Sequence, residues 1–166
     1  RALVLVDIAP RVNPQGVNRI LDFMAAHTGG FASLEDAAAA VAAYQPQRSQ
    51  RSDSGGLRKN LRLGEDGRWY WHWDPAMLAQ FRRTRDEAHD EEALYRAAGQ
   101  LRQPVLLVRG RMSDVVDEAI IREFQARIPQ ARVADVGGAG HMVAGDRNDV
   151  FLAAVADFLA QLETTA

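Results

Sequence analysis

The chain has 166 residues, of which 47% are hydrophobic and 25% charged, and it contains no cysteine. These proportions are typical of a folded globular protein with one sizeable core. The formal net charge of −2 offers no basic field for nucleic acid, and the lack of cysteine excludes disulfides, zinc thiolate sites and a cysteine nucleophile. No apolar run approaches the roughly 18 residues of a membrane-spanning helix and no signal-peptide pattern is present, so we expect a cytoplasmic protein that does not enter a membrane.

An apolar strand is predicted at the start of the chain. Residues 3–8 (LVLVDI) are apolar except for Asp7, which is typical of a strand buried on both faces of a parallel sheet. A domain seldom begins inside such a strand, because the strand needs neighbours on both sides. We therefore expect the chain to be a fragment, a processed piece or a truncated form of a longer protein.

Helical patterns, interrupted by one hairpin, fill the middle of the chain. The predicted elements are a helix over 14–28, an Ala-rich helix over 34–44 with Ser33 as its N-cap, a polar loop over 45–56, a short helix over 57–61, a hairpin within 62–73, a short helix after Asp74-Pro75 and a charged helix over 85–98. This segment is too long for a crossover and too structured for a linker. We expect residues 11–99 to form an inserted cap.

A second alternation of strands and helices ends the chain. The predicted elements are a fully apolar strand over 105–108, a helix over 117–127, a strand over 131–136 and an amphipathic helix over 147–163. Strand, helix, strand and helix in this order predict a parallel sheet with right-handed crossovers. The fold class is therefore α/β, with residues 1–10 and 100–166 as the core.

Two polar side chains follow neighbouring strands of that sheet. A glycine-rich loop, Gly137-Gly138-Ala139-Gly140, delivers His141 after one strand, and Asp114 follows another. Because parallel strands end at the same edge, Asp114 and His141 should meet there, and a carboxylate on one ring nitrogen leaves the other free as a general base. Asp114 has an alternative role as the cap of the next helix. Asp7 is an alternative acid, although a turn or structural role is preferred for it.

Aromatic residues are concentrated in the predicted insertion. Trp69, Trp71 and Trp73 alternate along the segment and would share one face. They are candidates for an apolar substrate pocket, and the alternative is that a small cap needs them for its own core. Met142, beside the predicted base, is a further candidate for substrate contact or for packing. The four histidines show no metal-ligand spacing, so no metal is expected.

The end segments resemble a known family. PVLLVRGRMSDVV and VADVGGAGHMVAGDRNDVF are similar to the C-terminal half of α/β-hydrolase-fold proteins, in which the acid follows the seventh strand and the histidine the eighth. LVLVDIAP is similar to the sixth strand, after which that family inserts its cap, and WYWHWDP resembles cap segments of esterases, epoxide hydrolases and cofactor-free haloperoxidases. The resemblance implies that Asp114 is the triad acid and His141 the general base.

The family's nucleophile motif is absent from these 166 residues. The nucleophile normally lies on a G-x-S-x-G elbow after the fifth strand, and no such motif occurs here. We therefore expect a hydrolase of an ester or similar small apolar substrate, without cofactor, that is inactive unless the missing N-terminal half binds it.

Two alternatives remain. One is an epoxide hydrolase or haloalkane dehalogenase-like enzyme with an Asp nucleophile. The other is a non-catalytic binding or assembly remnant whose first strand pairs with a partner chain, including a homo-oligomer.

Overall fold

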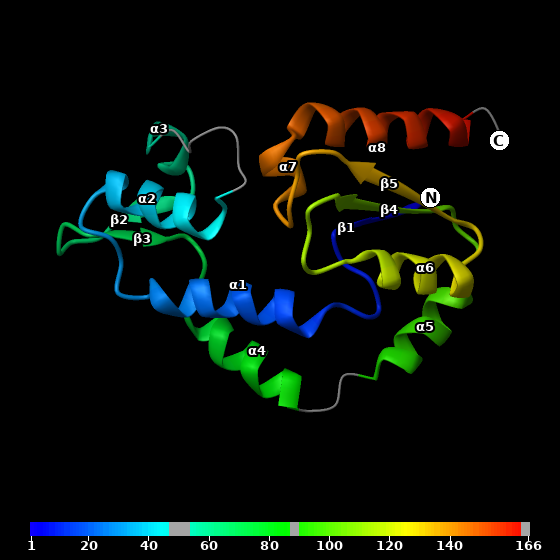
Figure 1. Ribbon diagram of the computed structural model, residues 1–166, viewed down its shortest axis with the longest axis horizontal. Helices are drawn as coiled ribbons and strands as arrows, with labels where there is room; N and C mark the ends of the chain where they lie inside the picture. The colour runs from blue at the N-terminus through cyan, green and yellow to red at the C-terminus, as the bar shows by residue number, and fades with distance from the viewer. Residues whose placement is uncertain (47–53, 87–89, 164–166) are drawn as a thin grey trace. The chain divides into compact units, whose positions relative to one another are not determined.

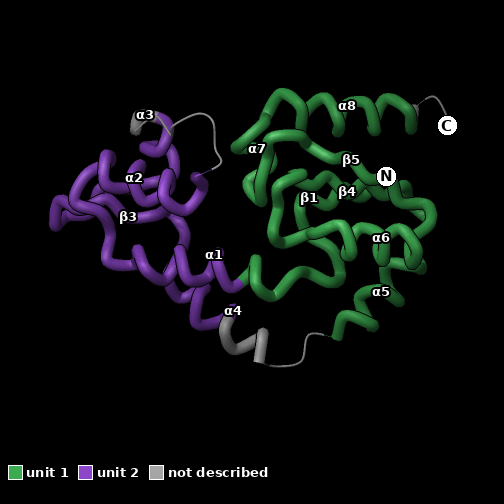
Figure 2. Tube along the Cα trace, viewed as in Figure 1, with its two compact units in different colours: residues 1–17, 90–166 green, residues 18–89 purple. Residues whose placement is uncertain are grey.

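The computed structural model describes residues 1–46, 54–86 and 90–163. The chain divides into two compact units (Figure 2), one made of residues 1–17 and 90–166 and the other of residues 18–89. Within the described ranges no helix is long and apolar enough to span a membrane.

A three-stranded parallel sheet is the centre of the first unit. Its strands are β1 (Leu3–Val6), β4 (Val105–Gly110) and β5 (Ala131–Val136), in the order β1-β4-β5. Every residue of β4 is buried, as the apolar run at 105–108 predicts for a central strand with both faces covered. Figure 1 shows why: α6 (Glu118–Arg127) covers one face of the sheet and α8 (Asn148–Glu163) covers the other.

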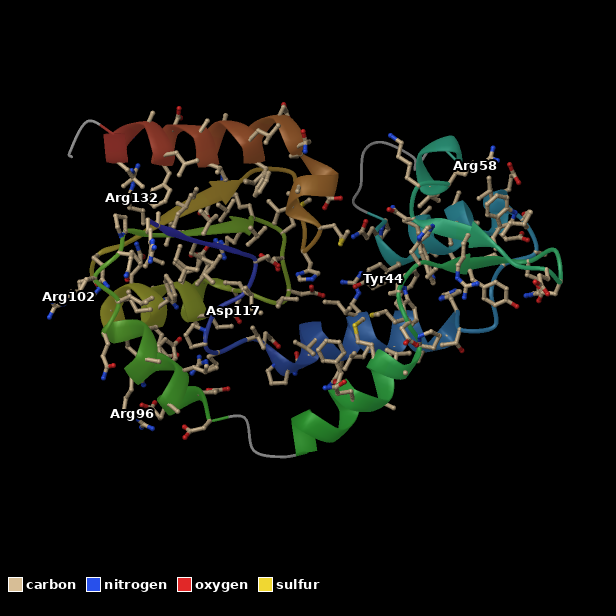
Figure 3. All side chains as sticks on the ribbon, turned by 180° about the vertical axis from the view of Figure 1, so that it is seen from behind. Tyr44, Arg58, Arg96, Arg102, Asp117 and Arg132 are labelled. Carbon is tan, nitrogen blue, oxygen red and sulfur yellow. The ribbon has the colours of Figure 1, made fainter. Side chains whose placement is uncertain are left out.

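The two faces of the sheet have separate packing partners. On one side Phe158 of α8 is 1% exposed and packs with Leu106 and Val136, and the guanidinium of Arg132 lies over its ring at 5.7 Å. Figure 3 shows the Arg132 side chain beside α8. The other side is covered by buried Ile120, Ile121 and Phe124 of α6. This sandwich of sheet between helices is the predicted α/β arrangement.

The predicted boundaries of the insertion, 11–99, differ from the compact unit of residues 18–89. Helix α5 (Glu91–Gly99) belongs to the first unit because Arg127 of α6 forms two hydrogen bonds to Glu92, at 2.8 and 2.7 Å. Arg127 also lies over the ring of buried Tyr95 at 4.5 Å. At the other boundary the Asn13 N–H donates to the Val115 carbonyl at 2.8 Å, so the chain leaves the first unit only within α1 (Pro14–Ala26).

The second unit combines helices with the predicted hairpin. Its helices besides the end of α1 are α2 (Leu34–Tyr44), α3 (Ser54–Leu57) and α4 (Ala76–Asp86). Strands β2 (Leu61–Leu63) and β3 (Trp69–Trp71) pair antiparallel across a turn in which Gly67 has a φ of 78°. The helix predicted over 57–61 is wrong, because Leu61 is buried as the first residue of β2.

Two other predicted elements differ in extent, and one helix was not predicted. Part of the polar loop predicted over 45–56 lies outside the described residues, and its last three residues are the first three of α3. The charged helix predicted over 85–98 is replaced by α5, which begins at Glu91 after its N-cap Asp90, and residues 87–89 lie outside the described ranges. A short helix that was not predicted, α7 (Val143–Asp146), lies between His141 and α8.

Candidate active site

Asp7 follows β1 directly and is the most buried acidic side chain of the sheet edge. Its side chain is inaccessible and the residue is 1% exposed. The Asp7 N–H continues the ladder by donating to the Val108 carbonyl at 2.8 Å, and the backbone then turns through a φ of 50°. Asp tolerates this left-handed conformation better than most residues other than glycine. The turn thus ends the strand at this residue.

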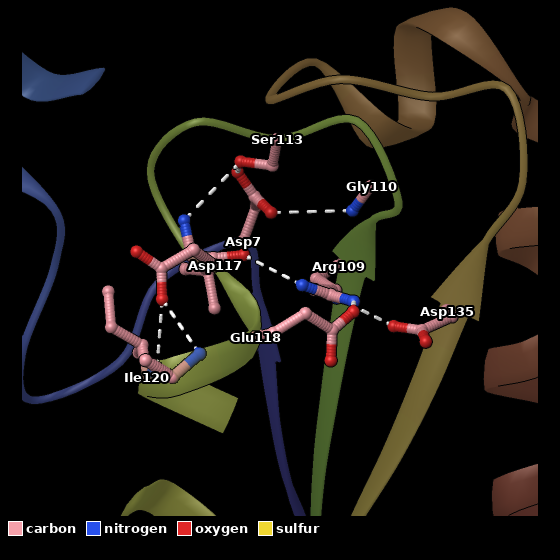
Figure 4. Close-up of polar contacts among 10 residues, drawn as sticks. Asp7, Arg109, Gly110, Ser113, Asp117, Glu118, Ile120 and Asp135 are labelled. Atoms are coloured by element: carbon pink, nitrogen blue, oxygen red, sulfur yellow. Dashed lines mark hydrogen bonds and ion pairs between the residues drawn. The ribbon is translucent and has the colours of Figure 1, made fainter. Parts of the chain in front are cut away.

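Three donors converge on the Asp7 carboxylate, and Figure 4 shows two of them, Ser113 and Gly110. Oδ2 accepts the Ser113 hydroxyl at 2.6 Å and Oδ1 accepts the Gly110 N–H at 3.3 Å. Oδ2 also lies 2.8 Å from Nδ1 of His141. Hydrogen bonds of this kind compensate a buried carboxylate for the water it has lost.

The loop that carries His141 crosses over the end of β4. A Cβ atom on Gly110 would lie 2.0 Å from the Gly140 carbonyl oxygen, so the two backbones touch at this point. The Met112 N–H donates to the Ala139 carbonyl at 2.9 Å, and Asp146 Oδ2 accepts the Gly140 N–H at 3.0 Å. The crossing brings His141 from the end of β5 past the central strand to Asp7 at the end of β1.

The pairing fixes the chemistry of the imidazole ring. Because the carboxylate accepts, Nδ1 of His141 carries the shared proton, and Nε2 is left as an acceptor. The His141 side chain is 35% exposed while that of Asp7 is fully buried. This is an oriented imidazole backed by a buried negative charge, the arrangement of a general base.

In the structure His141 pairs with Asp7, whereas the sequence ranked Asp114 first as its acid. Asp114 was predicted to contact His141, but Asp7 occupies the hydrogen-bonding position at Nδ1. The side chain of Ser113, one residue before Asp114, is directed at Asp7, and the Asp114 carbonyl lies against Gly16 of α1, where a Cβ would be 2.1 Å from its oxygen. The physical reason is the loop crossing at Gly110, which carries His141 beyond β4.

A buried arginine supports the loop after β4. Arg109 is 2% exposed, and its guanidinium pairs with Asp135 at 2.7 Å and with Glu118, and donates to the Val116 carbonyl at 3.2 Å (Figure 4). Burial lowers the pKa of Arg109, but its hydrogen bonds to the two carboxylates raise the pKa by more, so the net shift is upward. Arg109 therefore stays charged and ties the start of α6 to the sheet.

The predicted substrate-binding residues lie in different surroundings. Trp69 and Trp71 pack against the hydrophobic cluster of the second unit, which includes Phe31, and Trp71 meets the Phe31 ring edge-on at 5.6 Å. Trp73 is half-buried after β3, and Met142 is 54% exposed. A substrate contact for these four residues stays a prediction. Among the described residues no three His, Cys, Asp or Glu side chains are grouped so as to hold a metal ion.

Known proteins share this architecture. No protein-family model matches the sequence. The chain is 30% identical over 150 residues to a 3-hydroxybutyrate-oligomer hydrolase from Cupriavidus necator, covering 85% of this chain and 50% of that protein. Its structure resembles that of an E-2-(acetamidomethylene)succinate hydrolase, with a TM-score of 0.77 and 22% identity over 96% of this chain and 57% of that one. An α/β-hydrolase from Novosphingobium aromaticivorans gives a TM-score of 0.68 with 23% identity, covering 96% of this chain and 56% of the other.

The similarity to these structures defines the class of fold. The chain has the α/β-hydrolase fold and carries a C-terminal part of it, as the resemblance of its end segments predicts. It spans about half the length of the curated hydrolase from C. necator.

Proposed function

We propose that this chain supplies the acid and the base of a hydrolase that transfers an acyl group to water. The observation that carries the proposal is the 2.8 Å contact between Nδ1 of His141 and Oδ2 of buried Asp7, at the carboxyl ends of parallel strands. Open parallel sheets place their chemistry at this edge, outside the strand ends.

The mechanism follows from the orientation of the imidazole. Nε2 of His141 accepts the proton of a hydroxyl nucleophile as that nucleophile attacks a carbonyl carbon, and later returns it to the leaving group. Asp7 keeps the proton of the neutral His141 ring on Nδ1 and stabilises the His141 imidazolium that forms when Nε2 is protonated. The nucleophile comes from the part of the complete protein that lies outside these 166 residues, since they contain no G-x-S-x-G elbow.

The chemistry of the relatives favours an acyl bond as the substrate. The name of the C. necator relative refers to oligomers of 3-hydroxybutyrate, whose units are joined by esters, and that of the first structural neighbour to an acetamido compound, which is an amide. Ester hydrolysis is therefore the first expectation, with Trp69, Trp71, Trp73 and Met142 as substrate contacts. An epoxide or haloalkane as substrate would require an Asp nucleophile.

The test is His141→Ala in the complete protein, with His72→Ala as the matched control, because His72 is exposed in the second unit. The substrates are a panel of activated esters, N-acyl amides and epoxides. Loss of the base should lower kcat/KM for esters by about 10³-fold or more, while His72→Ala leaves it unchanged. Near-normal ester hydrolysis by folded His141→Ala protein would refute the assignment, and no hydrolysis by the wild-type protein would favour a non-catalytic binding module.

A further inference from the structure

The Ser113 hydroxyl lies between Asp7 and the first turn that leads to α6. Its oxygen is 2.6 Å from Asp7 Oδ2, 3.1 Å from the Val115 nitrogen and 3.4 Å from the Val116 nitrogen. Figure 4 shows Ser113 pointing at the carboxylate from the loop after β4. The mechanism proposed for His141 and Asp7 does not itself need this side chain.

The hydrogen-bond partners of the Ser113 hydroxyl determine which of them it donates to. A serine hydroxyl has one proton and two lone pairs. The two backbone N–H groups occupy the lone pairs, so the proton has only the Asp7 carboxylate as its acceptor. The loop backbone therefore fixes Ser113 as a donor to Asp7.

The donor acts on the same oxygen that faces the base. Oδ2 of Asp7 accepts both from Ser113 and from Nδ1 of His141. A second donor to Oδ2 takes up part of its negative charge and holds the carboxylate in the plane in which it meets the imidazole. Its loss leaves Asp7 with a stronger pull on the His141 proton but a less defined orientation.

We infer that Ser113 is a positioning residue, which orients Asp7 and moderates the strength of the Asp7–His141 hydrogen bond. The catalytic meaning of this inference rests on the proposed function. The alternative is that Ser113 only closes a turn through its lone pairs, in which case its proton would be without consequence for His141.

The first experiment observes the His141 Nδ1 proton by NMR in the protein, without need of turnover. Ser113→Ala should move this proton's chemical shift and speed its exchange with water, and Ser113→Thr should restore both. The matched control is Ser33→Ala, because Ser33 also accepts a backbone N–H, that of Asp36 at 3.0 Å, as the N-cap of α2. If Ser113→Ala does not fold, Ser113→Cys carries the test as a weak donor of similar size, with an intermediate effect expected.

The second experiment measures the pH profile of ester hydrolysis by the complete protein. Ser113→Ala should lower kcat/KM by about tenfold, the low end for a hydrogen bond to a charged group, and move the acid limb of the profile to higher pH. An unchanged Nδ1 signal in folded Ser113→Ala protein, or an equal change in Ser33→Ala, would overturn the inference. If the wild type hydrolyses nothing, the proposed function fails while the Nδ1 result still decides the role of Ser113.

Discussion

Replacing Asp7 by asparagine tests which carboxylate serves the base. Asparagine has the same shape as aspartate, but it offers one acceptor oxygen and an NH₂ group that only donates. In one orientation the amide oxygen of the asparagine accepts from His141 and Ser113, and its NH₂ then faces one donor, the Gly110 N–H, at 3.3 Å. The opposite orientation would set the NH₂ against two donors at 2.6 and 2.8 Å. The first orientation is therefore favoured, and it keeps the His141 tautomer while removing the charge.

The expected loss can be worked from this arrangement. Two unit charges about 4 Å apart interact by about 4 kcal/mol at an effective dielectric constant of about 20. Since about 1.4 kcal/mol corresponds to a factor of ten in rate, losing this stabilisation of the imidazolium should lower kcat/KM by about 10³-fold. The matched variant, Asp114→Asn, changes a half-buried side chain of the neighbouring loop and should alter kcat/KM by less than about threefold.

The assay is the hydrolysis of an activated ester by the complete protein, with urea unfolding to show that each variant is folded. A loss of about 10³-fold in Asp114→Asn together with near-normal activity in Asp7→Asn would refute the structural assignment and restore the acid that the sequence ranked first.

Two further predictions concern the free energy of unfolding. Gly110→Ala would place a Cβ 2.0 Å from the Gly140 carbonyl oxygen, so urea unfolding should show that the free energy of unfolding falls by about 3 kcal/mol. Gly137→Ala is the control, because nothing lies within 4 Å of its Cβ, and it should change the free energy of unfolding by less than about 0.5 kcal/mol. Equal effects of the two substitutions would contradict the backbone crossing. The hydrogen bond from the Ile120 N–H, followed by other contacts, lowers the pKa of Asp117. Its ionised form therefore stabilises the folded state above the ordinary pKa of aspartate and loses this effect as the pH falls through the lowered value. Asp117→Asn keeps an N-cap of similar quality, so its stability deficit should be present at neutral pH and vanish in acid, and a deficit independent of pH would argue against the charge.

The sequence predicts the sheet and its functional edge because local signals decide them. The apolar run at 105–108 has no polar residue to face water, which is enough to place it in the centre of a parallel sheet. Parallel strands end at one edge, so the histidine loop after the strand at 131–136 is correctly placed there. The structure likewise confirms the helix predicted to start at Asp117 and the hairpin predicted within 62–73.

The choice between acids could not be made from local signals. Asp114 and Asp7 both follow strands, and strand adjacency favours Asp114, since β4 is the neighbour of β5. The outcome depends on how closely two loop backbones approach, which is a tertiary property. The signal for it was a glycine, Gly110, immediately after the apolar strand residues, where a bulky side chain would have blocked the crossing.

The contacts of Ser113 and of Arg109 also depend on tertiary structure. Nothing in the sequence distinguishes a serine that donates to a residue 106 positions away from one that caps a turn. Arg109, an arginine within an otherwise apolar strand, stands out by its residue type, but its partners Asp135 and Glu118 are set by the register of β4 with β5 and by the start of α6.

The hydrogen bond between Asp7 and His141 joins residues 134 positions apart. Bringing such distant segments together costs chain entropy before their contacts stabilise the fold, so this pairing belongs to the slow, non-local part of folding. The contacts within residues 18–89 can form beforehand as a separate local unit. The His–Asp pair therefore forms only when β1, β4 and β5 have all assembled, and protection of its Nδ1 proton from exchange would report the completion of folding.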